Sequence, residues 1–171
     1  AYINKQLLQR GIEKDRMTLI PFGVDSEKFK PAQTRRKGKK FVAIFSGAIA
    51  QRKGIEYLLA AWGQLKLKDA ELVLCGMTHS NTKDILKKHE KDNSIKFKGL
   101  LSHEELLKEY QLADVFVFPS LREGSAKATY EAMACELPLI TTENAGSVAR
   151  DGKEGYIIPI KDVNKLKERI L

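Results

Sequence analysis

The stretch ADVFVFPSLREGSAKATYEAMA, residues 113–134, decides the fold. It contains a short apolar run, from Asp114 to Phe118, that Pro119-Ser120 brings to an end. An apolar run of this length, closed by a turn signal, is typical of a strand buried on both faces of a sheet. A helix is predicted to follow, from about Ser125 to Cys135. The stretch therefore predicts one strand–turn–helix unit of an α/β protein.

The same alternation of strand and helix continues on both sides of this unit. Further strands are expected at 41–46, 71–75, 94–98, 137–141 and 156–158. Further helices are expected from 54, over 82–91, from 102 and from 162. A helix at 2–10 and a strand at 17–20 are expected before them. Such alternation, with near-continuous apolar strands, predicts a Rossmann-like, doubly wound parallel sheet with helices on both faces. Its ligand would bind beyond the carboxyl ends of the strands, where Gly47, Gly76 and Gly99 stand.

Composition and charge exclude several classes of protein. The chain has 171 residues, of which 43% are hydrophobic and 30% charged, as in a globular domain and unlike a disordered chain. The net charge of +8 suits a solvated lysine-rich face, an anionic membrane or a phosphorylated ligand. Much of it lies in residues 35–40, an expected exposed loop. This run lacks the interleaved aromatic residues of a nucleic-acid groove, so no nucleic-acid partner is expected.

Cysteine, histidine and serine residues do not form the patterns of a metal site or a hydrolase. Cys75 and Cys135 stand in apolar surroundings without metal-type spacing and are predicted to be reduced core thiols. The 3 histidines are far apart in the sequence, which disfavours a zinc site. Neither Ser120 nor Ser125 lies in a GxSxG elbow, so serine hydrolase chemistry is not expected.

A loop of residues 47–54 joins the first strand of the sheet to its helix. It matches neither the GxGxxG pattern nor a P-loop. Arg52 and Lys53 nevertheless stand next to a helix N-terminus, where backbone amides and the helix dipole favour anions. From the residues alone, a phosphate clamp and a solvated basic turn are both open.

Glu123 and Glu131 are eight residues apart in the quoted stretch. Glu123 precedes a helix start, and Gly124 and Ser125 can leave backbone amides free for a ligand. Glu131 would lie roughly 12 Å further along the helix axis. We therefore expect the two carboxylates to contact different parts of one extended ligand rather than to share a proton or a metal. A carboxylate that accepts from two neighbouring hydroxyls can hold a ribose diol. The alternative is a dipole partner and an exposed helical glutamate.

Taken together and in order, these segments resemble glycosyltransferase family 4 of the GT-B enzymes. The matching segments are 20–25 with Phe29 and Pro31, similar to the linker I-P-N-G-V-D-x-x-x-F-x-P; 45–54, similar to the loop G-R-x-x-x-x-K-G; 95–99 and 113–120, similar to nucleotide-binding strands; 123–131, similar to E-x7-E; and 151–159, similar to D-G-x-x-G-x-L-V-P. The ordered set is far more specific than any one of these motifs.

The resemblance implies a retaining transfer of a hexose-type sugar from a UDP-, GDP- or ADP-sugar, with no metal or other cofactor. Glu131 would hold the ribose hydroxyls, Glu123 a donor-sugar hydroxyl near the anomeric carbon, and Lys53 with Arg52 the diphosphate. Catalysis would then consist mainly of positioning and charge stabilisation on the leaving group. Further donor contacts are implied at Gly47, Gly99, Leu100, Gly124, Ser125 and Ala126, with Leu100 near the base.

The chain departs from the family pattern at four positions. Ala48 stands where the family has arginine, and Arg52 is the nearest substitute. Ala126 replaces the family's second glycine after Glu123, Glu136 replaces the glycine of A-C-G-x-P, and Ser147 is nearest to a later family glutamate. Such changes would be expected in an enzyme that uses an unusual donor or has weakened catalytic activity.

The resemblance also implies a division of the chain. Residues 1–20 would be the tail of an N-terminal acceptor domain, 21–40 the interdomain linker, and 41–171 a nucleotide-sugar-binding domain cut within its last helix. We expect this chain to bind nucleotide without transferring sugar alone, in the cytoplasm or peripherally at the inner membrane face. The acceptor, a polysaccharide or lipid-linked saccharide precursor, would be bound by the N-terminal domain. Two alternatives are a GT-B nucleotide-sugar epimerase and a non-catalytic Rossmann-like module with a basic face.

Overall fold

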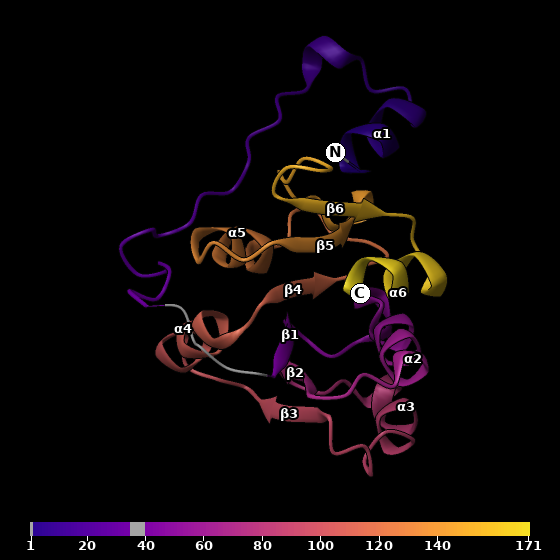
Figure 1. The fold of residues 1–171 in the computed structure, drawn as a ribbon. Helices are drawn as coiled ribbons and strands as arrows, with labels where there is room; N and C mark the ends of the chain where they lie inside the picture. The colour runs from indigo at the N-terminus through magenta and orange to yellow at the C-terminus, as the bar shows by residue number, and fades with distance from the viewer. Residues whose placement is uncertain (1, 35–39) are drawn as a thin grey trace.

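The computed structural model describes residues 2–34 and 40–171, which contain a six-stranded, entirely parallel sheet (Figure 1). Its strands are β1 (Phe41–Ser46), β2 (Ala70–Cys75), β3 (Ile95–Gly99), β4 (Val115–Phe118), β5 (Leu139–Thr142) and β6 (Gly155–Ile158). The order β3-β2-β1-β4-β5-β6 is that of a doubly wound sheet. The predicted Rossmann-like α/β fold is therefore confirmed.

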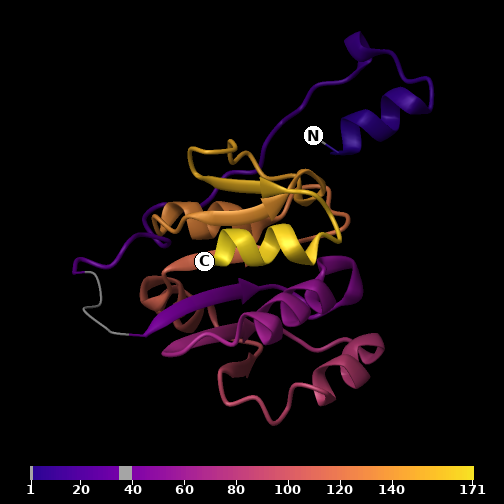
Figure 2. The same cartoon turned by 45° about the vertical axis from the view of Figure 1, so that its right-hand side comes forward.

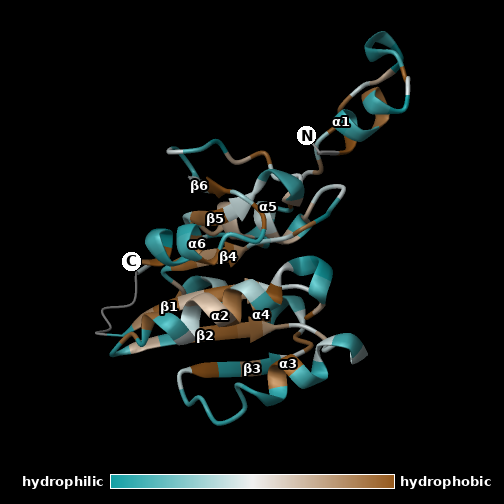
Figure 3. Cartoon of the chain, turned by 90° about the vertical axis from the view of Figure 1, so that its right-hand side faces the viewer, coloured by the Kyte–Doolittle hydropathy of each residue, from teal (hydrophilic) through white to brown (hydrophobic). Residues whose placement is uncertain are grey.

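Helices cover both faces of the sheet. On one face lie α2 (Ile55–Leu65), α3 (Lys83–Lys87) and α6 (Val163–Ile170), and on the other α4 (His103–Leu112) and α5 (Lys127–Ala134) (Figures 1 and 2). Because no strand face of the central sheet meets water, β1 and β4 consist almost wholly of buried apolar residues. Figure 3 shows these strands as hydrophobic and the outer helices as mixed.

Local signals in the sequence set the ends of two helices. Ser102 caps α4, since its hydroxyl accepts from the Glu105 amide while the Glu105 carboxylate accepts from the Ser102 amide. Asp162 caps α6 by accepting from the Lys165 amide at 2.8 Å. The helices that the sequence predicts from 102 and from 162 are therefore confirmed.

The segment before the sheet is fastened to the core by one aromatic side chain. Asp25 begins a turn in which its carboxylate accepts from the amides of Glu27 and Lys28, both at 3.1 Å. The turn delivers Phe29 into the core, where it is 4% exposed. There its ring meets the ring of Tyr110 edge-on, with centroids 6.2 Å apart. Whether residues 21–40 link two domains stays a prediction.

The predicted strand at Met17–Ile20 is wrong. These four residues have no regular secondary structure, and they follow α1 (Tyr2–Gln9) and a 3-10 turn, η1 (Lys14–Arg16). In Figure 2 the chain after η1 comes down toward the sheet without joining it, so no neighbouring strand in the described chain satisfies the backbone groups of this segment. Apolar sequence alone does not make a strand without a partner.

Two predicted helices are shorter than expected. The predicted helix over 82–91 consists of a 3-10 turn, η3 (Ser80–Thr82), and α3, which ends at Lys87 because no apolar residue follows Leu86 to hold another turn against the core. The helix expected from Ser125 begins at Lys127 as α5. Ser125 and Ala126 instead stay outside the helix and contact a neighbouring loop.

Both cysteines are buried free thiols, as predicted. Burial raises the pKa of Cys75 to about 12 and the pKa of Cys135 to about 11. Both groups are therefore protonated at neutral pH and behave as core side chains.

The structure describes only part of the basic run. Of the basic run 35–40, residues 35–39 lie outside the described residues. Among the residues that the structure describes, no helix has the length and apolar character needed to cross a membrane.

The loops at the carboxyl ends of the strands pack directly on one another. Gly54, which follows the 3-10 turn η2 (Gln51–Lys53), has φ +72° and lies against the loop after β4. A Cβ atom at Gly54 would come within 2.0 Å of the Pro119 carbonyl oxygen. Glycine is thus required at this position both for backbone conformation and for space.

We predict that Gly54→Ala destabilises the protein by about 2–4 kcal/mol, from left-handed strain of about 1 kcal/mol plus overpacking. Gly152→Ala is the matched control, because Gly152 has φ +73° but nothing within 4 Å of an added Cβ. It should lose only the strain term, about 1 kcal/mol. Urea unfolding of both variants measures the difference, and equal losses would contradict the close contact with Pro119.

Candidate functional site

The topology places one crevice at the carboxyl edge of the sheet. The chain runs from β1 outward to β3, then returns to add β4 on the other side of β1. A sheet of this kind binds its ligand at this switch point, beyond the carboxyl ends of the two strands. Here the loops are residues 47–54 after β1 and residues 119–126 after β4. Both were singled out from the sequence.

Backbone hydrogen bonds join these two loops. The Arg52 carbonyl oxygen accepts from the Leu121 amide at 2.9 Å and from the Ser120 hydroxyl at 3.1 Å. Ser120 is fully buried, so water does not compete for this contact. The 3-10 turn that carries Arg52 and Lys53 is therefore held beside the loop that carries Glu123.

Lys53, Arg52 and Glu123 form one charged cluster at the crevice. The Lys53 ammonium lies 2.8 Å from Glu123 Oε1, and Arg52 binds the same oxygen. The side chains of Lys53 and Glu123 are 11% and 12% exposed, whereas Arg52 is half-exposed. Lys53 also lies over the Phe118 ring, 5.0 Å from its centroid. Two cations share one carboxylate, so the cluster keeps a positive charge that suits an anion.

Burial is the main influence on Lys53. It lowers the pKa of Lys53, because a buried ammonium loses its hydration. The Glu123 carboxylate opposes this effect by hydrogen bond and charge, and Arg52 adds to the lowering. A second anion beside Lys53 would favour its charged form further, so anion binding and the protonation of Lys53 support each other.

The loop that carries Glu123 is fixed from the side of β5. The Glu123 amide donates to the Asn144 carbonyl at 2.8 Å and the Ala126 amide to the Ala145 carbonyl at 3.1 Å. Ala126 is buried, and its amide is therefore not free for a ligand, contrary to the role expected for it. The amides of Gly124 and Ser125 have no acceptor within the described part of the chain. They remain the two candidate donors of this loop.

Glu131 takes a different partner from Glu123. The Tyr110 hydroxyl of α4 donates to Glu131 Oε2 of α5 at 3.2 Å. Nothing in the sequence indicates this contact, because the two residues belong to separate helices. The structure therefore brings Glu123 to Arg52 and Lys53, and brings Glu131 to Tyr110.

Within residues 2–34 and 40–171, no group of acidic, histidine or cysteine side chains is placed to hold a metal ion.

An open cavity of about 280 Å³ lies at the carboxyl ends of β1, β2 and β3. Its lining is mostly apolar and comprises Ser46, Gly47, Ala48, Cys75, Gly76, Met77, Leu100, Leu101 and Leu106. Two of the predicted site residues, Gly47 and Leu100, thus share one cavity. Gly99, also predicted, lies beside it and accepts from the Gly76 amide at 2.7 Å. Walls of this kind suit a flat, largely apolar group.

A second cavity, of about 470 Å³, lies on the other side of the charged cluster. It is lined by Ile3, Gln6, Leu7, Arg10, Arg52, Arg122, Glu123 and Gly124. Helix α1 therefore forms one wall, and the cluster forms the other. Arg10 and Arg122 were not predicted. The position of Arg122 next to Glu123 was a signal for it, whereas nothing local connects Arg10 with this site.

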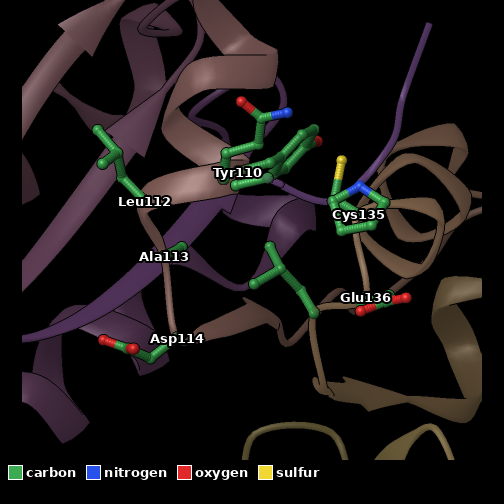
Figure 4. Close-up of a pocket in the computed structure, with 10 residues that line it drawn as sticks. Tyr110, Leu112, Ala113, Asp114, Cys135 and Glu136 are labelled. Carbon is green, nitrogen blue, oxygen red and sulfur yellow. The ribbon is translucent and has the colours of Figure 1, made fainter. Parts of the chain in front are cut away.

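A third cavity, shown in Figure 4, is separate from this site. It has a volume of about 100 Å³ and lies where β4 and β5 begin, so it opens at the amino ends of the strands. Its lining includes Tyr110, Asp114, Cys135 and Glu136. None of the predicted site residues lines it. The candidate site is consequently the carboxyl edge alone.

Comparison with known proteins gives a consistent family. The model of glycosyl transferases group 1 matches residues 26–171. The putative glycosyltransferase EpsD of Bacillus subtilis is 32% identical over 165 residues, which cover 86% of this chain and 42% of that protein. The chain spans less than half the length of the curated relatives it matches, at 44%, 37% and 42% for three of them.

Solved structures agree with the fold. The C-terminal domain of LpcC, a glycosyl transferase group 1 family protein from Francisella tularensis, superposes with a TM-score of 0.75 at 26% identity, over 86% of each chain. Anabaena HepE, solved in complex with UDP and glucose, gives a TM-score of 0.81 at 19% identity, over 97% of this chain and 49% of that chain. The second likeness concerns the fold alone. The chain belongs to the family of glycosyl transferases group 1, and its sheet is that of the C-terminal domain of GT-B glycosyltransferases.

Proposed function

We propose that this chain is the donor-binding part of a retaining glycosyltransferase. The enzyme would transfer a hexose-type sugar from a nucleoside diphosphate sugar to a polysaccharide or lipid-linked saccharide precursor. The observation that carries the proposal is the buried Lys53–Glu123 pair with Arg52 at the switch point of the sheet. It lies between the loops that follow β1 and β4, where a sheet of this kind binds nucleotides.

The geometry supports an extended orientation for the donor. The base would lie in the cavity that contains Gly47 and Leu100, since its walls are mostly apolar. Glu131 would hold the ribose hydroxyls, and Arg52 with Lys53 would bind the diphosphate. The sugar would then reach Glu123 and the free amides of the next two residues. Anabaena HepE, which shares this fold, was solved in complex with UDP and glucose, and this supports a nucleotide sugar as the ligand.

Charge stabilisation would provide most of the catalysis. When the bond between the anomeric carbon and the diphosphate breaks, negative charge develops on the leaving oxygen. A Lys53 ammonium in a site that excludes water stabilises that charge more strongly than one in solution. Glu123 would accept from a sugar hydroxyl and thereby orient the anomeric carbon. In this proposal the two cations act on the diphosphate without a metal.

The acceptor would be bound mainly by a part of the enzyme outside this chain. Support comes from the relatives, of which the chain spans less than half. Helix α1 and the segment after it would be the tail of that acceptor domain. The family resemblance also motivates a cytoplasmic location with peripheral contact at the inner membrane face.

The first prediction concerns nucleotide binding. Titration calorimetry of the chain with UDP, GDP and ADP should detect binding of at least one, and Glu131→Ala should weaken it about tenfold or more, since a charge-assisted hydrogen bond is lost. Glu136→Ala is the matched control, because Glu136 follows the same helix but lies at the cavity of Figure 4. Salt-sensitive DNA binding without any nucleotide binding would instead support the non-catalytic basic module.

The second prediction isolates the diphosphate contact. Lys53→Met keeps the length of the side chain but removes its charge, so it should weaken binding of the nucleoside diphosphate about tenfold or more. Binding of the corresponding nucleoside, which lacks phosphate, should stay unchanged within about twofold. Lys165→Met, on the exposed face of α6, is the control. An equal loss for nucleoside and diphosphate would place Lys53 outside the phosphate site.

The third prediction concerns transfer. The 171-residue chain, incubated with the nucleotide sugar that it binds and a range of saccharide acceptors, should release no more nucleoside diphosphate than a sample without protein. Sugar transfer by this chain alone would overturn the division of donor and acceptor binding between two domains.

A further inference from the structure

Tyr110 is a fully buried tyrosine whose hydroxyl donates to a charged side chain. Its hydroxyl donates to Glu131 Oε2 at 3.2 Å, and its residue exposure is 0%. A buried hydroxyl without a partner would cost free energy, so the burial of Tyr110 favours its hydrogen bond to Glu131. The contact crosses from α4 to α5 and thus fixes Glu131 relative to the sheet.

The protonation state of Tyr110 suits this contact with Glu131. Burial, and then the charge of Glu131, raises the pKa of Tyr110 well above its ordinary value. Tyr110 therefore remains a neutral donor across the physiological range. A carboxylate offers about four lone-pair sites, so one bond from Tyr110 leaves room for two ligand hydroxyls.

Packing on the other side prevents Tyr110 from moving away. Its ring meets the Phe116 ring of β4 with centroids 5.9 Å apart, and the Phe29 ring with centroids 6.2 Å apart. The next residue, Gln111, donates from its amide side chain to the Lys30 carbonyl at 3.0 Å. Tyr110 is thus enclosed by the sheet and by the segment that precedes it. Its hydroxyl is thereby held beside Glu131.

From these contacts we infer that Tyr110 is a positioning residue that orients the Glu131 carboxylate for a ribose diol. It thereby sets the preference of the site for ribonucleotides over nucleotides without ribose hydroxyls. The inference rests on the proposed function, because it needs Glu131 to bind the ribose. Tyr110 itself does not contact the ligand in this account.

The test compares nucleotides that differ only in the ribose. Tyr110→Phe removes the hydroxyl and keeps the ring, and its binding is measured by calorimetry with UDP, GDP and ADP and with their 2′,3′-dideoxy counterparts. We expect affinity for the ribonucleotide to fall about tenfold, with the dideoxy form changed less than about twofold. Tyr156→Phe is the control, since Tyr156 lies on the edge strand β6 and stacks on Arg169.

A second comparison separates positioning from general loosening of the fold. In a Glu131→Ala background, Tyr110→Phe should change ribonucleotide affinity less than about twofold, because the oriented carboxylate is already gone. An equal fall for ribonucleotide and dideoxynucleotide would overturn the inference and leave a purely structural role. An undiminished ribonucleotide affinity in Tyr110→Phe would overturn it too. If Glu131→Ala still weakened binding in that case, the proposed function would stand without the role of Tyr110. A wild-type chain that binds both nucleotide forms equally would overturn the ribose assignment and the inference together.

Discussion

The Arg52 carbonyl oxygen accepts two hydrogen bonds from the loop after β4, and much of the site depends on that contact. It joins residues that are 68 and more positions apart in the chain and holds the loop after β1 against the loop after β4. Gly54 permits the approach, because any side chain there would meet Pro119. The same contact places Lys53 and Arg52 beside Glu123, so a backbone interaction determines where the charges of the site lie.

Glu123 and Glu131 consequently lie in different environments. Glu123 binds Lys53 and Arg52 in the charged cluster after β4, and Glu131 accepts a hydrogen bond from Tyr110 of the neighbouring helix α4. The first environment suits phosphate and sugar, and the second suits a neutral diol. A ligand with all of these groups in a row, lying across the switch point of the sheet, would account for both. The nucleoside diphosphate sugar proposed as the donor contains all of these groups.

Much of the fold could be predicted from local signals, because short runs of sequence indicate buried strands and capped helices. The capping box at Ser102 and the apolar run of β4 are examples. The strand expected at Met17–Ile20 failed because pairing depends on distant residues. Candidate site residues in contiguous motifs, such as Lys53 and Glu123, could be named in advance, and the structure places these two in contact. Tyr110 could not, because its contact with Glu131 exists only after two helices pack on the same face of the sheet.

Hydrogen exchange of the chain, with and without the nucleoside diphosphate that it binds, tests the central claim most directly. The claim is that the nucleotide lies across the carboxyl edge of the sheet, between the loops after β1 and β4. It predicts that binding slows amide exchange in residues 47–54, 99–101 and 120–131. Slower exchange confined to residues 110–114 and 135–137, around the cavity of Figure 4, would contradict it.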